Sequence, residues 1–194
     1  RGEEVTWIED VAWAEERGAD VIASGLGYID WYEFSDLDGG TALITAAAEM
    51  ASARGVCVVN QAGNERANSW QHIIPPADGR SVIAVGSADL VGQVTFWSSP
   101  GPTADGRIKP DLLALGASVT IASYHAQGWY VPADGSNYAS AQVAGVVALM
   151  LEQNPRLNPT QIGDALRETA SRSAAPDNDF GWGLVDAHAA VNYW

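Results

Sequence analysis

The chain has 194 residues, of which 47% are hydrophobic, and this is enough for one compact domain with a buried core. We therefore expect a single domain over residues 1–194. Ten Lys and Arg against 24 Asp and Glu give a formal net charge of −14. With that balance and no basic cluster, nucleic acid is excluded as the expected partner. No apolar run approaches the roughly 18 residues of a transmembrane helix, so we expect no membrane partner either.

The first half of the chain alternates helical and strand patterns. Apolar residues recur at helical spacing over residues 5–17 and again over 41–54, and a glycine follows each pattern. Short apolar runs come next, at 21–23 and 55–60, and are typical of buried strands. The order helix, strand, helix, strand predicts parallel crossovers, and such sheets carry ligand sites at the carboxyl ends of their strands.

The second half of the chain is expected to add strands and then helices. Further strands are predicted at 81–87, 93–97, 119–124 and 128–131, where apolar and β-branched residues lie between turn signals. Helices are predicted at 137–153, 159–171 and 185–193. The first of these is apolar and Ala-rich, which is typical of a central buried helix. Together the elements indicate an α/β fold with a mainly parallel sheet.

Two glycine-containing segments follow the predicted strands of the first half. The first segment is Gly25, Leu26 and Gly27, and the second is Asn60, Gln61, Ala62, Gly63 and Asn64. Because the carboxyl ends of parallel strands meet at one edge of a sheet, we expect the two segments to lie side by side. The Asn64 amide is then a candidate donor to a developing oxyanion, although Asn after Gly also suits an ordinary turn.

Several separate segments resemble subtilisin-like serine peptidases in the order and spacing of that family. They are residues 21–27, 63–64, 81–86, 96–102, 105–111 and 180–187, and Gly25 stands where the family usually has Ser. The resemblance implies a three-layer, parallel-sheet subtilisin-like fold, with the N-terminal third of the domain absent from this chain. It also implies peptide-bond hydrolysis as the family activity, with a substrate groove built from residues 25–27 and 60–63.

Residues 134–145 resemble the nucleophile loop of the family and the helix that follows it. Gly135, Ala139 and Val143 fix the register of this comparison. In that register Asn137 stands at the position of the nucleophilic Ser. An amide has no hydroxyl that a neighbouring base can activate, so the acyl-enzyme route is closed at this position.

No neighbouring residue supplies a replacement for the missing nucleophile and base. Ser136 and Ser140 lie one residue before and three after the nucleophile position, so their side chains leave the helix start in other directions. The resemblance places the catalytic Asp and His upstream of this chain. His72, His125 and His188 lie in no family-like catalytic context. We therefore predict that the chain does not cleave peptides by itself.

Three smaller predictions concern single positions. The peptide bond before Pro76 is expected to be cis, because the turn there resembles a cis turn of the family. Asp111, with the backbone near Ala77, resembles a weak cation site of some members, but Lys109 would repel a cation. We thus expect no metal or other cofactor, and Ca²⁺ near Asp111 is the weak alternative. The lone Cys57 lies in an apolar run and is expected to be buried.

Three functional interpretations remain open. In the first, the chain is an inactivated fragment of an endopeptidase whose secretion is inferred from the family alone. In the second, it is a natural pseudopeptidase that binds peptides, and concurrent departures at Asn137, Ala141, Gln142 and Leu115 favour this. In the third, it completes a domain with a missing N-terminal segment or by self-association, because a sheet without its upstream strands exposes an edge.

Overall fold

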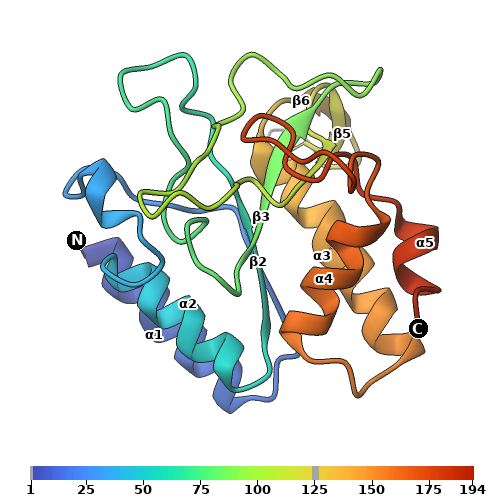
Figure 1. The fold of residues 1–194 in the computed structure, drawn as a ribbon, viewed down its shortest axis with the longest axis horizontal. Coiled ribbons are helices and arrows are strands. Elements are labelled where there is room, and N and C mark those ends of the chain that lie inside the picture. The colour runs from blue at the N-terminus through green and yellow to red at the C-terminus, as the bar shows by residue number, and fades with distance from the viewer. Residues whose placement is uncertain (1, 124–126) are drawn as a thin grey trace.

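We describe residues 2–123 and 127–194 in a computed structural model of the chain (Figure 1). Its sheet has four parallel strands in the order β1-β2-β3-β4. The strands are β1 (Val21–Ser24), β2 (Cys57–Gln61), β3 (Ile83–Ala88) and β4 (Leu112–Leu115). The parallel crossovers that the order of elements predicts are therefore present.

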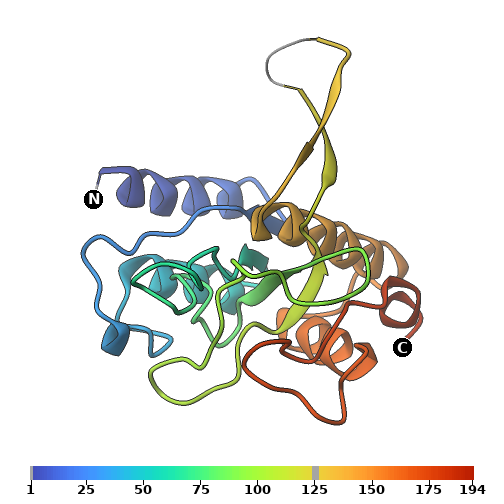
Figure 2. The same ribbon diagram turned by 90° about the horizontal axis from the view of Figure 1, so that it is seen from above.

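Helices cover both faces of this sheet. One face carries α1 (Gly2–Glu16) and α2 (Leu43–Ala53), and the other carries α3 (Ser136–Gln153), α4 (Pro159–Thr169) and α5 (Ala187–Val191). Figures 1 and 2 show the two helical layers with the strands between them. A short 3₁₀ helix, η1 (Phe34–Asp36), lies in the connection between β1 and α2. This confirms the three-layer α/β fold.

The core lies on the two faces of the central strands. On one face Val59 and Val85 pack with α3, and on the other Val58 packs with Trp7 of α1 and Ile44 of α2. Every residue of β2 and β3 is buried. Strands buried on both faces read as continuous apolar runs rather than alternating ones, which is why they were visible in the sequence.

The two edges of the sheet differ. At the β4 edge, Leu113 donates its N–H to the carbonyl of Gly183 (2.9 Å) and accepts from the N–H of Val185 (3.0 Å). The chain around Leu184 thus closes this edge as a parallel bridge. At the β1 edge, no strand within residues 2–123 and 127–194 pairs with the outer side of β1, and Ala23 is exposed.

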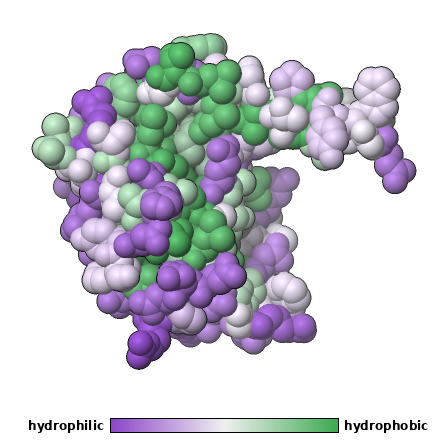
Figure 3. Space-filling view, turned by 90° about the vertical axis from the view of Figure 1, so that its right-hand side faces the viewer, coloured by the Kyte–Doolittle hydropathy of each residue, from purple (hydrophilic) through white to green (hydrophobic). Residues whose placement is uncertain are grey.

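A hairpin projects from the body of the molecule. It consists of β5 (Val119–Ala122) and β6 (Tyr130–Ala133), which pair antiparallel. Figures 2 and 3 show it as an arm extending away from the helical layers, and Figure 3 also shows apolar residues gathered in a band across the adjoining side. The predicted pair of strands is confirmed, while Tyr124 and His125 lie outside the described residues.

Three sequence predictions need correction. Residues 93–97 do not form a strand, because the side chain of Asp89 accepts the N–H groups of Val91 and Gln93 and holds a turn that leaves a single bridge, from Ala88 to Val94. The sequence prediction missed β4, the run Leu112–Leu115, which lacks the β-branched residues of the predicted strands. The terminal helix α5 is also shorter than the predicted 185–193.

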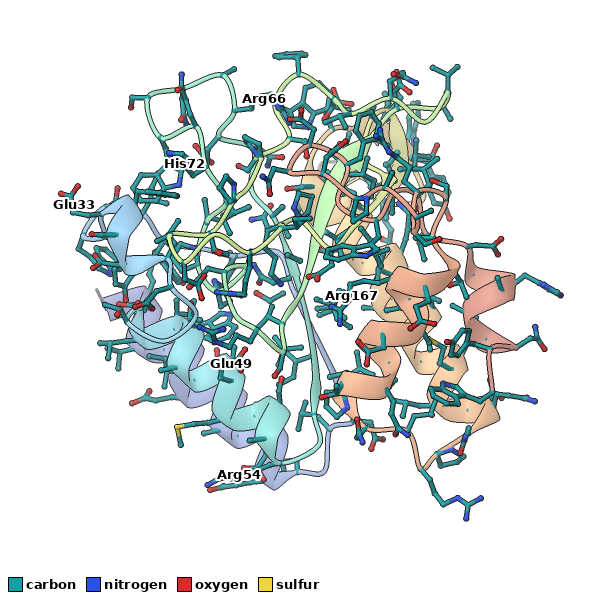
Figure 4. All side chains as sticks on the ribbon, viewed as in Figure 1. Glu33, Glu49, Arg54, Arg66, His72 and Arg167 are labelled. Atoms are coloured by element: carbon teal, nitrogen blue, oxygen red, sulfur yellow. The ribbon has the colours of Figure 1, made fainter. Side chains whose placement is uncertain are left out.

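A buried charge cluster lies beneath the β4 edge. The Asp111 carboxylate accepts hydrogen bonds from Lys109 Nζ (2.7 Å), the Ala84 N–H (2.8 Å) and Arg167 Nη1 (3.0 Å). Burial alone would raise the pKa of Asp111, but the charges of Lys109 and Arg167 outweigh it and lower the pKa. Figure 4 shows Arg167 reaching from α4 toward the sheet. No group of three metal-ligating side chains occurs among the described residues.

Two single-position predictions are confirmed. The peptide bond between Pro75 and Pro76 is cis. Cys57 is buried in β2, and desolvation, assisted by the nearby Asp20 charge, raises the pKa of its thiol to about 12. Separately, no helix in the described part of the chain has the length and apolarity needed to cross a membrane.

Candidate active site

Three segments of the chain converge at the carboxyl edge of the sheet. They are the segment after β1 at Gly25, the turn after β2 at Asn64, and the first turn of α3 at Asn137. A Cβ placed on Gly25 would lie 2.9 Å from Cβ of Asn137, so the absence of a side chain there lets α3 approach β1. The sequence prediction that these residues form one site depends on this convergence, and the structure brings them together.

Asn64 is held beside the start of α3 by a single hydrogen bond. Its Oδ1 accepts from the N–H of Ser136 (2.9 Å), the residue before Asn137. The Nδ2 group donates to no other described residue and belongs to an exposed side chain. The amide nitrogen of Asn64 is thus exposed at the edge of the sheet, beside the first turn of α3.

Asn137 itself folds back over the turn that precedes α3. Gly135 has φ +149°, and a Cβ there would lie 2.2 Å from Oδ1 of Asn137, so both the backbone and the space favour glycine. The Asn137 carbonyl accepts from the Ser140 hydroxyl (2.9 Å). Asn137 is therefore held in a defined position at the start of α3. Its side-chain amide cannot act as a nucleophile.

Gln61 links all three converging segments, a role that sequence reasoning missed. Its Nε2 donates to the Gly25 carbonyl (2.6 Å), and its Oε1 accepts from the Ser136 hydroxyl (3.0 Å). The side chain thus crosses from β2 to β1 and to α3. Two polar residues, Asn60 and Gln61, at the end of a buried strand were the available signal, but their partners could not be named before the segments were placed.

The predicted groove residues do not all reach the surface. Gly25 and Leu26 are exposed and Gly27 is half-buried, whereas Asn60 and Ala62 are fully buried. Asn60 donates to the Gln61 carbonyl within the strand (2.9 Å). Gln61 and Gly63 are buried as well, so the exposed part of this region consists of the 25–27 segment and Asn64.

Two cavities border the 25–27 segment on the side of α1. One measures about 250 Å³ and the other about 830 Å³. The walls that they share are Trp7, Asp10 and Leu26. The 25–27 segment therefore has open space beside it on the side of α1.

No imidazole serves Asn137 among the described residues. His72 stacks on Phe34 of η1 with ring centroids 4.1 Å apart, and burial lowers its pKa. Figure 4 shows His72 beside η1. His188 is exposed on α5. The hydroxyls of Ser136 and Ser140 each donate to another group, as described above, so neither has a base as its partner.

Sequence comparison identifies relatives of the chain. The model of the Subtilase family matches residues 1–183. Subtilisin DY of Bacillus licheniformis is 32% identical over 185 residues, which are 95% of this chain and 61% of that protein. Serine protease AprX of Bacillus subtilis (strain 168) is 31% identical over 168 residues, 76% of this chain and 38% of that protein. The chain thus spans less than two thirds of these two relatives.

Structural comparison gives the same fold. The self-cleaved protease domain of PatA superposes with a TM-score of 0.78 at 24% identity, covering 98% of this chain and 67% of that one. MycP1 from Mycobacterium smegmatis gives a TM-score of 0.76 at 24% identity, covering 100% and 55%. With the family match over residues 1–183, these findings confirm the resemblance: the chain belongs to the subtilase family of serine peptidases.

Proposed function

We propose that this chain is the peptide-binding part of a serine endopeptidase domain and that it does not cleave peptides by itself. The observation that carries the proposal is the convergence of Gly25, Asn64 and Asn137, with an amide at the nucleophile position. Asn137 has no hydroxyl, and no imidazole of the described residues lies beside it, so the covalent route has neither its nucleophile nor its base in this part of the chain.

The 25–27 segment supports binding of an extended peptide. It continues β1 beyond the last paired residue, and its carbonyls at Leu26 and Gly27 accept no hydrogen bond from other described residues. A peptide laid alongside would add a strand, with main-chain hydrogen bonds supplying much of the affinity. Its carbonyl opposite Asn64 would occupy the place of the bond that an active relative would attack.

Restoring the nucleophile tests this proposal. We expect Asn137→Ser alone to leave the hydrolysis of a fluorogenic peptide at the background rate, because no imidazole in residues 2–123 and 127–194 serves as a base for position 137. Mixed with a subtilisin-like N-terminal segment that carries Asp and His, the same variant should hydrolyse the peptide. Asn137→Ala in the same mixture is the matched control. Hydrolysis by the unmixed wild-type chain would overturn the proposal.

A natural pseudopeptidase is the second candidate, and the number of departures from the family pattern favours it. Asn137, Ala141, Gln142 and Leu115 all depart from that pattern, and Gln142 Nε2 donates to the main-chain carbonyl of residue 115 (2.6 Å). Several departures fit gradual divergence better than a single inactivating change. If this candidate holds, Asn137→Ser will bind peptide but remain inactive in the mixture as well.

The open β1 edge favours a further proposal about partners. We propose that an upstream segment of the domain or a second copy of the chain covers it, since an unpaired edge is prone to pairing. Sedimentation velocity of the isolated chain tests this. A monomer that binds no added N-terminal segment would contradict it. Secretion likewise remains a proposal that rests on the family.

A further inference from the structure

The open edge of β1 presents main-chain groups at alternate residues. The carbonyl of Asp20 accepts from the N–H of Cys57 (2.8 Å), so the backbone of residue 20 points toward β2. Because the backbone groups of successive strand residues point to opposite sides, Val21 and Ala23 turn their N–H and carbonyl groups outward. A strand laid against this edge would find donors and acceptors in place.

A cavity of about 420 Å³ lies beside the start of this edge. Its apolar walls are Val21 of β1, Ala148 and Leu151 of α3, and Pro155. Val21 packs toward the core on the α3 side of the sheet, whereas Ile22 packs on the α1 side. The residue of an added strand that lies opposite Val21 would direct its side chain to the α3 side as well. The cavity is therefore placed to receive one side chain of the covering strand.

The remaining walls of this cavity are both acidic. They are Asp20, just before β1, and Glu152, in the last turn of α3. Both residues are exposed, and neither forms a salt bridge within the described part of the chain. Two unpaired carboxylates beside apolar walls favour a side chain that has an aliphatic stem and a cationic end, and Lys and Arg are the side chains of this kind.

A second copy of the chain fits this cavity less well. A symmetric pair would lay β1 of one copy beside β1 of the other. Residues 19–53, which contain β1 and the connection after it, include no Lys or Arg. Each copy also carries a net charge of −14. Repulsion between like charges opposes such a pair, so charge complementarity favours a basic segment over a second copy.

We propose that the β1 edge binds an extended segment that carries Lys or Arg opposite Val21, in preference to a second copy of the chain. The cationic end of that side chain pairs with Asp20 and Glu152, and its stem covers Ala148 and Leu151. The inference rests on the proposed covering of the β1 edge and adds to it the chemistry of the covering segment.

Peptide binding measured by fluorescence anisotropy tests the inference. The probes are fluorescein-labelled peptides Ser-Thr-Val-Xaa-Val-Thr-Ser, with Xaa as Lys, Met or Glu. In an added strand, alternation directs Xaa to one face of the sheet and both Val side chains to the other. We expect the wild-type chain to bind the Lys probe about three- to fivefold more tightly than the Met probe, the effect of a partly exposed ion pair, and the Glu probe least tightly.

The double variant Asp20→Asn, Glu152→Gln should lose this preference, so that the Lys and Met probes bind equally. Glu3→Gln with Asp30→Asn is the matched control. It removes two negative charges as well, but from the 830 Å³ cavity beside the 25–27 segment, and should keep the wild-type ratio. A further measurement needs no variant. Raising NaCl from about 50 mM to about 500 mM should remove the preference of the wild type, because salt screens exposed charges.

The inference and the proposed covering of β1 fail in different ways. Equal binding of the Lys, Met and Glu probes by the wild-type chain would overturn the inference and leave the covering of the edge intact. The same follows if the Lys preference persists in the Asp20→Asn, Glu152→Gln variant. In sedimentation velocity, a dimer of the wild-type chain that the Lys probe does not dissociate would identify a second copy as the occupant and overturn the inference. A monomer that binds none of the probes would overturn both.

Discussion

The two edge strands of the sheet have the same length, but one edge is covered by another segment and the other edge is open. The β4 edge is closed by the chain around Leu184 and underlain by the Asp111 cluster. The β1 edge is open along Ala23 and continues into the exposed 25–27 segment. The buried ion pairs lie at the closed edge, and the unpaired backbone lies at the open edge. The contacts that we expect to stabilise the fold and the candidate binding segment are therefore on opposite sides of the sheet.

The largest expected effect is at the closed edge. Asp111→Asn removes the charge that Lys109 and Arg167 share and leaves a buried ammonium without its counterion. We expect the free energy of unfolding to fall by about 3–5 kcal/mol, measured by urea denaturation. Asp164→Asn, which removes only the exposed partner of Arg167, is the control and should cost at most about 1 kcal/mol. Equal losses of unfolding free energy in Asp111→Asn and Asp164→Asn would contradict a stabilising role for the buried cluster at the closed edge.

A second change tests whether the closing segment itself matters. Gly183 has φ +100°, and a Cβ there would lie 2.4 Å from Oγ of Ser171 and 2.7 Å from the Arg172 nitrogen. Gly183→Ala should therefore destabilise the chain by about 1–3 kcal/mol in the same assay. Gly145→Ala on α3, where a Cβ would meet nothing within 4 Å, is the matched control. An unchanged free energy of unfolding in Gly183→Ala would show that the β4 edge tolerates displacement of the segment that closes it.

We expect acid to lower the free energy of unfolding through Asp105, which lies on the closed side of the sheet. Hydrogen bonds from Arg107 and Thr103, with the charge of Arg80, lower the pKa of Asp105 to about 2, in the turn that leads toward β4. A carboxyl whose folded pKa lies below its usual value stabilises the fold above that usual value, near 3.8, and loses this as pH falls toward about 2. Stability measured from pH 5 to 2 should fall less steeply in Asp105→Asn. An identical slope would contradict this.

The smallest effect on stability is expected at the open edge. Ala23→Lys places a charge on an exposed residue of β1, so the free energy of unfolding should change by no more than about 0.5 kcal/mol. A lysine on an edge strand nevertheless opposes pairing with another chain. Sedimentation velocity should therefore show less self-association than in the wild type. A large stability loss would mean that β1 is already covered.

The fold was more predictable than the site. The apolar runs of β2 and β3 and the glycine-flanked helices follow from local periodicity, and the register around Asn137 follows from local resemblance. The strand wrongly predicted at 93–97 shows where periodicity fails, because the exposed Phe96 mimics an alternating pattern that the Asp89 turn overrides. Local sequence patterns predict secondary structure only where residues that are close in sequence determine it.

The contacts that shape the groove could not be predicted in this way. Gln61 acquires its role from Gly25 and Ser136, which are 36 and 75 residues away along the chain. Ile74 likewise lies against both Gly27 and Gly63. Such contacts depend on which segments meet in space, so a sequence without placed segments cannot name them.

The buried thiol of Cys57 gives the chain a built-in reporter of its own opening. Cys57 pairs in register with Val21, so it lies one strand inward from the open edge. With its pKa raised to about 12, the thiol is protonated and unreactive at neutral pH while the sheet is closed. Its side chain packs in the cluster that joins β2 to α3, so its alkylation requires this layer to open. The same chain can thus be compared with and without a bound strand at its edge, with no added label.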